Sequence, residues 1–228
     1  MTSDIDPKGN RVLQADSQQR ARLLPMLKQE AMRRGLLAAD AEIDAATAFT
    51  LVRDMPYRRA SDRRPETIIR EWRGTCSGKH YLLKALFAEL GLSARVMACT
   101  TARHFRPGEL PPDLEKTLAE AGGRFVDVHN YLILELPEGE MIVDATWPLS
   151  ARDKGMVVNE QFVWGKDQRI AAEPLQVWPV PEDVDPQAFK NRLLNAHFTP
   201  AELAARDRFI EKLSEMLQTA EPSAARDK

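Results

Sequence analysis

A run of apolar residues at helical spacing is the feature that most constrains the fold of this chain. It lies in residues 71–91, which read "EWRGTCSGKHYLLKALFAELG". The apolar positions of the run are Leu82, Leu83, Leu86, Phe87 and Leu90. Gly91 follows, at the position where a helix commonly ends. This spacing predicts a helix with one buried face, around which the rest of the chain must pack.

Cys76 stands at the expected beginning of this helix, directly after Thr75. Unpaired backbone N–H groups and the helix dipole stabilise a thiolate at such a position. Cys76 precedes Leu83 by about two helical turns, so both residues lie on the same side of the helix. The pattern therefore predicts an inward-facing thiol with nucleophilic character. The alternative is a buried thiol that packs as a small hydrophobic side chain.

Strands are predicted after this helix. The first covers 94–100, and a second over 125–136 is followed by a turn at 137–139 and a return strand over 141–145. A proline-rich stretch between the first two strands is expected to be a loop with a short helix near 114–121. The fold class predicted is α+β, with the Cys76 helix packed on an antiparallel sheet.

Helices are also predicted on both sides of this core. Asp40 is expected to cap a helix that ends before Pro56, and Thr199 to open a helix through a capping box with Glu202. Residues 17–34 and 65–74 are predicted to hold further helices. Residues 151–180 have no clear period and are predicted to form short strands and loops. Residues 1–16 and 221–228 are expected to be loosely packed or disordered.

The composition excludes several classes of protein. The chain has 228 residues, of which 43% are hydrophobic and 29% charged, with a formal net charge of −2. That charge gives no basic footprint for nucleic acid, and the longest apolar runs are too short to span a bilayer. We therefore expect neither a nucleic-acid nor a membrane partner. The polar beginning "MTSDIDPKGN" lacks the apolar region of a secretory signal, which favours a cytoplasmic protein whose two cysteines, Cys76 and Cys99, are free thiols.

A histidine and an aspartate follow Cys76 in the order that thiol catalysis needs. His129 lies in the middle of the apolar second strand, and Asp144 ends the next strand. If the residue numbers of directly opposed positions in the hairpin add up to an odd number, both side chains point to the same side of the sheet. A carboxylate beside an imidazole fixes its tautomer and stabilises the imidazolium. Cys76, His129 and Asp144 are therefore the candidate nucleophile, base and orienting group.

Three blocks of the chain together resemble the transglutaminase-like superfamily of the papain-like cysteine-enzyme fold. They read "IIREWRGTCSGKHYLLKALFAELGLSARVM", "DVHNYLIL" and "IVDATW". The resemblance covers about residues 49–150 and implies that Cys76, His129 and Asp144 form a catalytic triad that needs no cofactor. The resemblance leaves both ends of the chain unexplained. The helical patterns predict a single domain over 1–228, in which a helical lead (17–54) precedes the papain/transglutaminase-like core and an extension with helices (151–228) follows it.

The activity expected from this resemblance is acyl transfer, or amide or peptide hydrolysis, through a thioester on Cys76. The substrate would be a peptide, an amide or another acyl compound. Two alternatives stay open. One is a catalytically inactive binding module of the same fold. The other is an acyl-CoA transferase, because "RGTC" resembles the "RGG-x-C" of arylamine N-acetyltransferases.

Other side chains are weaker candidates for contacts with the substrate or with a developing oxyanion. They are Tyr57, Trp72, Arg73, His80 and His104. The backbone N–H of Cys76 is a further predicted oxyanion donor. Lys79 is expected to be solvated, and Cys99 to lie in the core.

A metal site and a dimer are the remaining alternatives. Thiolate, imidazole and carboxylate are zinc ligands, and Cys76, His80, His129 and Asp144 would supply them. No short C-x-x-C or H-x-x-x-H spacing accompanies them, so we expect no metal. The apolar face of the C-terminal helix favours packing within the chain, with a homodimer seam as the alternative.

Overall fold

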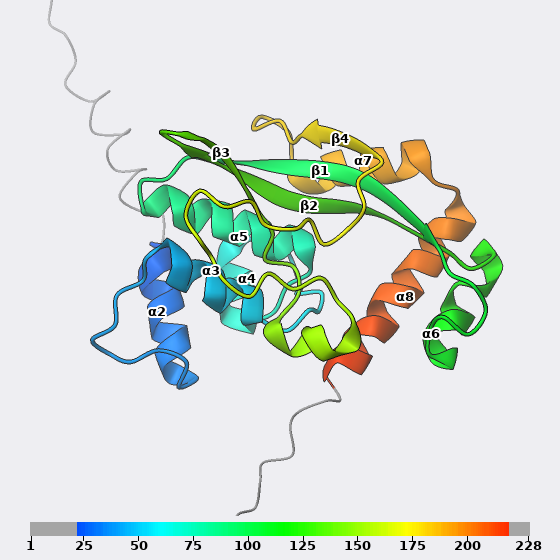
Figure 1. Ribbon diagram of the computed structural model, residues 1–228, viewed down its shortest axis with the longest axis horizontal. Helices are drawn as coiled ribbons and strands as arrows, with labels where there is room; N and C mark the ends of the chain where they lie inside the picture. Colours follow the sequence, from blue (N-terminus) through cyan, green and yellow to red (C-terminus); the bar gives the residue numbers. More distant parts are fainter. Residues whose placement is uncertain (1–21, 219–228) are drawn as a thin grey trace, which may run out of the picture.

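The computed structural model describes residues 22–218 as an α+β fold built on one four-stranded antiparallel sheet. The strands lie in the order β3-β2-β1-β4 (Figure 1). Their bounds are β1 Ala94–His104, β2 Arg124–Leu136, β3 Gly139–Val143 and β4 Gln176–Pro179. The helices are α2 Leu23–Arg33, α3 Ala45–Asp54, α4 Pro65–Glu71, α5 Cys76–Glu89, α6 Pro112–Thr117, α7 Pro186–His197 and α8 Pro200–Gln218. Short 3-10 helices cover Ala119–Ala121 and Leu149–Lys154. The α+β class and the antiparallel sheet are as expected.

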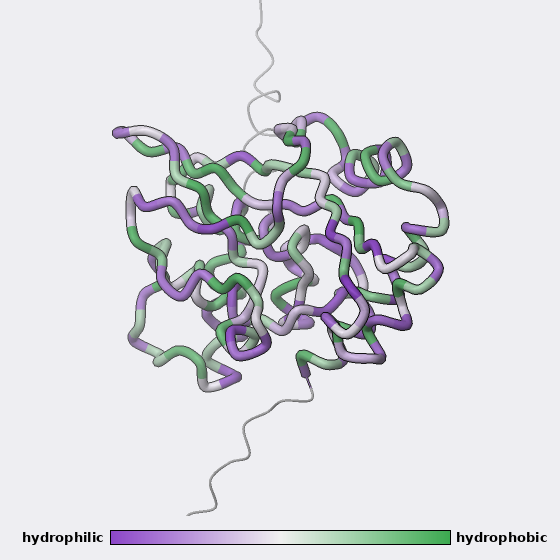
Figure 2. Tube along the Cα trace, turned by 45° about the vertical axis from the view of Figure 1, so that its right-hand side comes forward, coloured by the Kyte–Doolittle hydropathy of each residue, from purple (hydrophilic) through white to green (hydrophobic). Residues whose placement is uncertain are grey.

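Helix α5 packs directly on the two central strands, β1 and β2. The predicted apolar residues form its buried face, and Leu82, Leu83, Leu86 and Phe87 are fully inaccessible to solvent. Across the interface lie apolar side chains of the sheet, among them Val96 and Leu132. Figure 2 shows hydrophobic and hydrophilic residues interspersed along the trace, as expected where each element has one buried and one exposed face. The central helix therefore has a fixed position on the sheet.

Helices α2, α3 and α4 surround the side of α5 that faces away from the sheet (Figure 1). The Asp44 carboxylate caps α3 by accepting a hydrogen bond from Thr47 N at 2.7 Å. The expectation that Asp40 caps this helix is therefore wrong by one turn. The part of the first predicted helix that precedes residue 22, and the predicted loose ends of the chain, lie outside the described residues.

The start of α5 lies unusually close to α4. A Cβ atom added at Gly78 would come within 2.7 Å of the Cδ1 atom of Ile68 on α4. Glycine in the first turn therefore lets the beginning of α5 approach α4, and this contact holds the helix end that carries Cys76.

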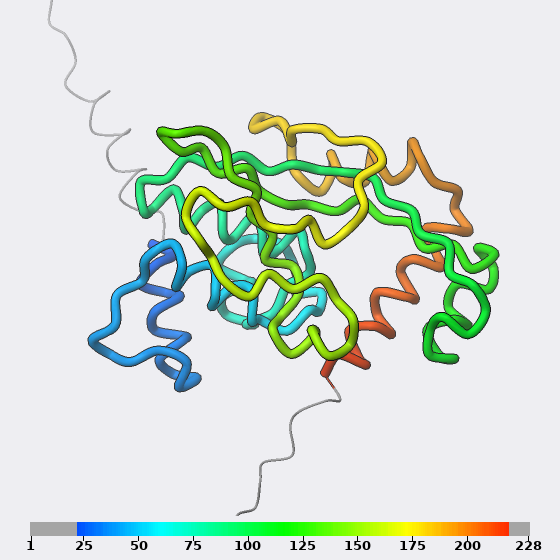
Figure 3. The backbone as a smooth tube through the Cα atoms, in the orientation of Figure 1, coloured from blue at the N-terminus to red at the C-terminus, as the bar shows by residue number. Residues whose placement is uncertain are grey.

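The chain between β3 and β4 crosses the sheet, as Figure 3 shows in yellow-green and yellow. Gln168 N donates to Ile142 O on β3 at 3.0 Å, and Leu175 N donates to Thr100 O on β1 at 2.9 Å. Ile170 packs between these two points against the cluster of Cys99 and Tyr131. This crossing segment, residues 156–175, covers part of the sheet. The sequence predicts it only as short strands and loops.

Two helices follow the sheet, whereas the sequence predicts one. Helix α7, which the sequence analysis does not predict, packs on β1 and β2 through Phe189 and Leu193. Helix α8 packs on β2 and α6 through Ala205, Phe209 and Leu213. The face of α8 considered as a homodimer seam is thus covered by the same chain. Among residues 22–218, no helix is long and apolar enough to cross a membrane.

Candidate active site

Cys76 is the first residue of α5, and the backbone around it is open to an anion. The first backbone hydrogen bond of this turn runs from Lys79 N to Thr75 O at 3.0 Å. Thr75 is the N-cap residue but makes no side-chain capping bond. The first-turn N–H groups therefore point out of the helix end without a side-chain cap, in the arrangement that stabilises a thiolate or an oxyanion.

The β2–β3 hairpin brings His129 and Asp144 together. Leu132 pairs with Val143, so the paired residue numbers add up to an odd number and the condition for a shared side of the sheet holds. His129 Nε2 lies 2.8 Å from Asp144 Oδ2. With Nε2 engaged by the carboxylate, Nδ1 is the ring nitrogen left for the thiol of Cys76, and the interaction of the two side chains lowers the pKa of the thiol and raises that of the imidazole.

Asp144 is fixed by its neighbours on every side. Its carboxylate accepts hydrogen bonds from Thr146 N at 3.0 Å and from Ala171 N at 2.8 Å. Its backbone N–H donates to Gln168 Oε1 at 2.8 Å, and its carbonyl oxygen accepts from Asn159 Nδ2 at 2.8 Å. Three of these partners belong to the crossing segment, so that segment holds the carboxylate against His129.

These contacts predict that Asp144→Asn lowers stability as well as activity. An asparagine has one acceptor oxygen where the carboxylate has two, so its NH₂ group would face one of the donors, and a buried donor would lose its partner. The expected loss is about 1–3 kcal/mol of the free energy of unfolding, measured in denaturant. Asp167→Asn, on the exposed part of the same segment, is the matched control. An unchanged midpoint for Asp144→Asn would contradict this account of the carboxylate.

His80 is a neutral positioning residue one turn after Cys76. Its side chain is fully buried, and burial lowers its pKa to about 4. Ala145 N donates to Nε2 at 2.9 Å, so Nδ1 carries the proton and donates to Cys76 O at 2.7 Å. The 3.6 Å approach of Nε2 to Asp144 Oδ1 is therefore a contact without a hydrogen bond. His80 links the helix start to the end of β3, and both its nitrogens are used, so it is not free to contact a substrate.

A lysine from the unpredicted helix α7 lies over the thiol. Lys190 Nζ is 3.9 Å from Cys76 Sγ and donates to Ser77 Oγ at 3.2 Å. Its ammonium is also 3.6 Å from Asp127 Oδ1, and Arg206 forms an ion pair with the same carboxylate at 2.6 Å. Lys190 is only 4% exposed, so its charge acts on the thiol through a medium of low dielectric constant.

These neighbours set the charge of the site. Burial raises the pKa of Cys76, but the Lys190 ammonium and the interaction with His129 outweigh it and lower the thiol pKa to about 6. Burial lowers the pKa of His129, whereas Asp144 and the thiolate raise it to about 10. Near neutral pH the pair is therefore a thiolate beside an imidazolium. Burial raises the pKa of the second thiol, Cys99, to about 12.

The other candidates lie in different environments. Tyr57 is buried against Trp147 with 4.3 Å between ring centroids, and the Cys76 thiolate adds to the effect of burial in raising its pKa. Trp72 packs in the hydrophobic core, with the Arg34 guanidinium 5.1 Å from its ring.

Arg73 pairs with Glu71 at 2.6 Å, and His104 is exposed at the end of β1. Of the five weaker candidates, Tyr57 and His80 are therefore the two that interact with Cys76.

The prediction that Lys79 is solvated is wrong. Its side chain is fully buried, and its Nζ donates to Arg53 O at 2.8 Å and to Thr146 O at 3.0 Å. Burial lowers its pKa to about 7. Lys79 thereby connects the segment that follows β3 with the last turn of α3.

Comparison with known proteins gives no family for this chain. No family model matches it, and no curated protein sequence matches it either.

Within the described residues, no three histidine, cysteine, aspartate or glutamate side chains are grouped so that they could hold a metal ion.

Proposed function

We propose that the protein is a thiol acyltransferase or hydrolase that forms a thioester on Cys76. The observation that carries the proposal is the arrangement around the thiol. Cys76 begins a helix, its pKa is lowered to about 6, and His129 beside it is held by Asp144 at 2.8 Å. A lowered thiol pKa, a base and an orienting carboxylate are the parts that nucleophilic catalysis by cysteine requires.

In the first half-reaction, Cys76 Sγ attacks the carbonyl carbon of an amide or ester. The oxygen gains negative charge in front of the uncapped N–H groups of α5. His129 then gives its proton from Nδ1 to the leaving group, the bond between carbon and the leaving group breaks, and a thioester remains on Cys76. Asp144 keeps the ring oriented throughout, because Nε2 stays bonded to the carboxylate.

In the second half-reaction, water or an amine attacks the thioester. Neutral His129 takes a proton from the attacking oxygen or nitrogen as the new bond to carbon forms. The bond between carbon and sulfur breaks, and the thiolate and imidazolium are restored. Hydrolysis and transfer to an amine use the same residues and differ only in the acceptor.

The same geometry supports a papain-like and transglutaminase-like core. A helix beginning with the cysteine lies on an antiparallel sheet, the histidine comes from β2, and the aspartate directly follows the neighbouring strand β3. The resemblance in the three sequence blocks adds to this support. The proposed core covers about residues 49–150, and Lys190 of the C-terminal extension contacts its thiol.

The direct test is to trap the acyl-enzyme. The purified protein would be mixed with simple phenyl thioesters and quenched in acid, and its peptides would be weighed by mass spectrometry. We expect an acyl adduct on Cys76 that disappears on incubation with water or hydroxylamine. Cys99→Ala should retain the adduct and Cys76→Ala should lose it. Adducts that form equally on both cysteines, or on neither, would contradict the proposal.

The burial of the thiol favours a second candidate, a binding module without catalysis. Cys76 is only 2% exposed, with Lys190 and Ser77 close to its sulfur. In a binding module the Cys76 thiol would stay inaccessible to reagents. In a catalyst the side chain of Lys190 must move so that a substrate can reach the thiol.

Alkylation kinetics distinguish the two candidates. In the catalytic protein, iodoacetamide is expected to label Cys76 and not Cys99, because only Cys76 has a lowered pKa. The labelling rate should increase with pH around a midpoint of about 6, where the thiolate forms. The measurement is peptide mass spectrometry at a series of pH values, with urea-unfolded protein as the reference for full reactivity. Labelling of Cys76 that begins only on unfolding would favour the binding module.

A further inference from the structure

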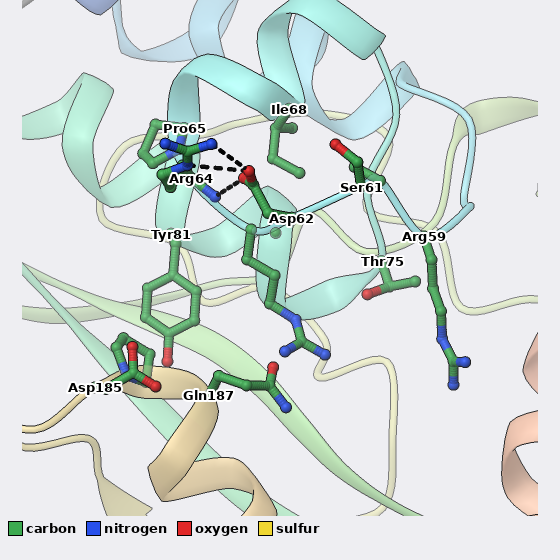
Figure 4. Close-up of a pocket in the computed structure, with 14 residues that line it drawn as sticks. Arg59, Ser61, Asp62, Arg64, Pro65, Ile68, Thr75, Tyr81, Asp185 and Gln187 are labelled. Atoms are coloured by element: carbon green, nitrogen blue, oxygen red, sulfur yellow. Dashed lines mark hydrogen bonds and ion pairs between the residues drawn. The ribbon is translucent and has the colours of Figure 1, made fainter.

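A cavity of about 730 Å³ lies beside the first turn of α5. Thr75 and Gly78, which flank Cys76 in the sequence, form part of its wall. The loop of residues 59–65 forms another part, and the beginning of α7 a third. Figure 4 shows Tyr81 and Gln187 entering this space from α5 and α7. Cys76 itself is not a lining residue, but the cavity borders the first turn of α5, which begins with it, so a molecule bound there would lie beside that turn.

One positive charge of the cavity has no partner within the described part of the chain. Two of its three arginines are paired: Arg64 with Asp62 and Arg59 with Asp207, each at 2.6 Å (the first pair is drawn in Figure 4). Arg63 makes no hydrogen bond or ion pair with any residue in 22–218. It is half-buried, and burial lowers its pKa, so its charge is only partly compensated by water.

The environment of Arg63 points to a carboxylate ligand. Among the negative charges that act on this guanidinium, the Cys76 thiolate has the largest effect, so Arg63 lies within electrostatic range of the reacting sulfur. Arg59 and Arg64 are neutralised by their carboxylate partners, and the one remaining guanidinium, Arg63, matches a monoanion better than a phosphate dianion. A guanidinium also binds a carboxylate through two parallel hydrogen bonds.

Gln187 offers the complementary contact. Its Oε1 atom is buried and has no hydrogen-bond partner within the described part of the chain, although its Nε2 donates to Asn191 Oδ1 at 2.5 Å. Buried acceptors are normally paired, and a ligand N–H group would satisfy this one. A peptide provides an amide N–H and a carboxylate a short distance apart.

We propose that this cavity binds the carboxylate of an acidic peptide substrate through Arg63, with Gln187 Oε1 accepting from a peptide N–H. The inference rests on the proposed function, because it names the substrate class of the Cys76 site. The carboxylate is either an acidic side chain in the acyl group or the C-terminal carboxylate of the leaving group. Either source uses the same guanidinium.

Matched pairs of thioesters test the proposal and separate the two sources. The acyl pair is the phenyl thioesters of N-acetylglutamate and N-acetylglutamine, which differ in charge but not in shape. The leaving-group pair is the N-acetylalanyl thioesters of mercaptoacetate and mercaptoacetamide, where mercaptoacetate replaces a C-terminal glycine. For each pair, the ratio of second-order acylation rates at Cys76 is measured in wild type, Arg63→Gln and Arg58→Gln. Arg58 directly precedes residues 59–65, is exposed and does not line the cavity.

We expect wild type to favour the charged member of at least one pair about tenfold or more, the effect of one charge-assisted hydrogen bond. Arg63→Gln should bring that ratio near one, and Arg58→Gln should leave it within about twofold. Preference in the first pair identifies an acidic acyl residue, and preference in the second identifies a C-terminal carboxylate. A ratio near one for both pairs in wild type, or a preference that survives Arg63→Gln, would overturn the proposal.

Calorimetric titration with the α-amide of N-acetylglutamate, a monoanion, measures binding independently of catalysis. We expect one site per chain that is lost in Arg63→Gln and kept in Cys76→Ala. Binding with this dependence but no acylation of Cys76 by any probe would refute the proposed function and leave the carboxylate site standing. Acylation without binding or charge preference would refute the carboxylate site and leave the proposed function standing.

Discussion

Replacing His129 with alanine is expected to slow acylation of Cys76 by about 10³-fold, in the range that removal of a general acid–base group produces. The variant loses the proton donor for the leaving group and the imidazolium beside the thiolate. The thiol also loses one of the interactions that lower its pKa, so less of it is ionised at neutral pH. The measurement is the pre-steady-state rate of adduct formation with a phenyl thioester at pH 7.

The melting temperature of each His129 variant must be measured together with its acylation rate. Removing the ring leaves Asp144 buried without its cationic partner, although Thr146 N and Ala171 N still donate to the carboxylate. His129→Gln keeps most of the volume and a side-chain donor for Asp144, and it serves as the matched variant. Both variants are expected to be acylated at Cys76 much more slowly than wild type. If either one melts near wild type and is acylated at the wild-type rate, His129 is a structural residue.

The parts of the fold that the sequence predicts are those encoded by local patterns. The apolar run from Leu82 to Leu90 fixes the buried face of α5, and Gly91 marks its end. The hairpin is visible because two apolar strands flank a short turn of proline and glycine. The sequence points to Cys76, His129 and Asp144 because each occupies a defined place in one of these elements, at a helix start or near the end or middle of a strand.

The rest of the site depends on contacts between distant parts of the chain. Lys190 lies in a helix whose sequence gives no sign of function, and it reaches Cys76 only because α7 packs on β1 and β2. The donors to Asp144 come from a segment without regular periodicity. Lys79 was expected to be solvated because lysine is rarely buried. Two backbone carbonyl groups accept its hydrogen bonds, which no local pattern reveals.

Replacing Lys190 with methionine is expected to move the pH dependence of acylation toward higher pH. The ammonium is the largest of the influences that lower the pKa of Cys76, against the opposing effect of burial. In wild type the thiolate forms above about pH 6, so the rate should increase around that value. Without the cation the protonated thiol is favoured, and the midpoint should rise by about 1–2 pH units. At pH 6, where wild type is about half ionised, the rate is then about five- to fiftyfold lower, whereas near pH 9 the two proteins converge.

Lys190→Arg is the matched control, because it keeps a positive charge over the sulfur. The midpoint of its pH dependence should stay close to that of wild type. This result separates the effect of the charge from the effect of filling the space. Arg206 still pairs with Asp127 in the methionine variant, so that carboxylate is not left unpaired. A pH-independent loss of rate in Lys190→Met, equal at pH 6 and pH 9, would mean that Lys190 positions α7 and does not stabilise the thiolate. An unchanged profile would exclude the lysine from the chemistry of Cys76.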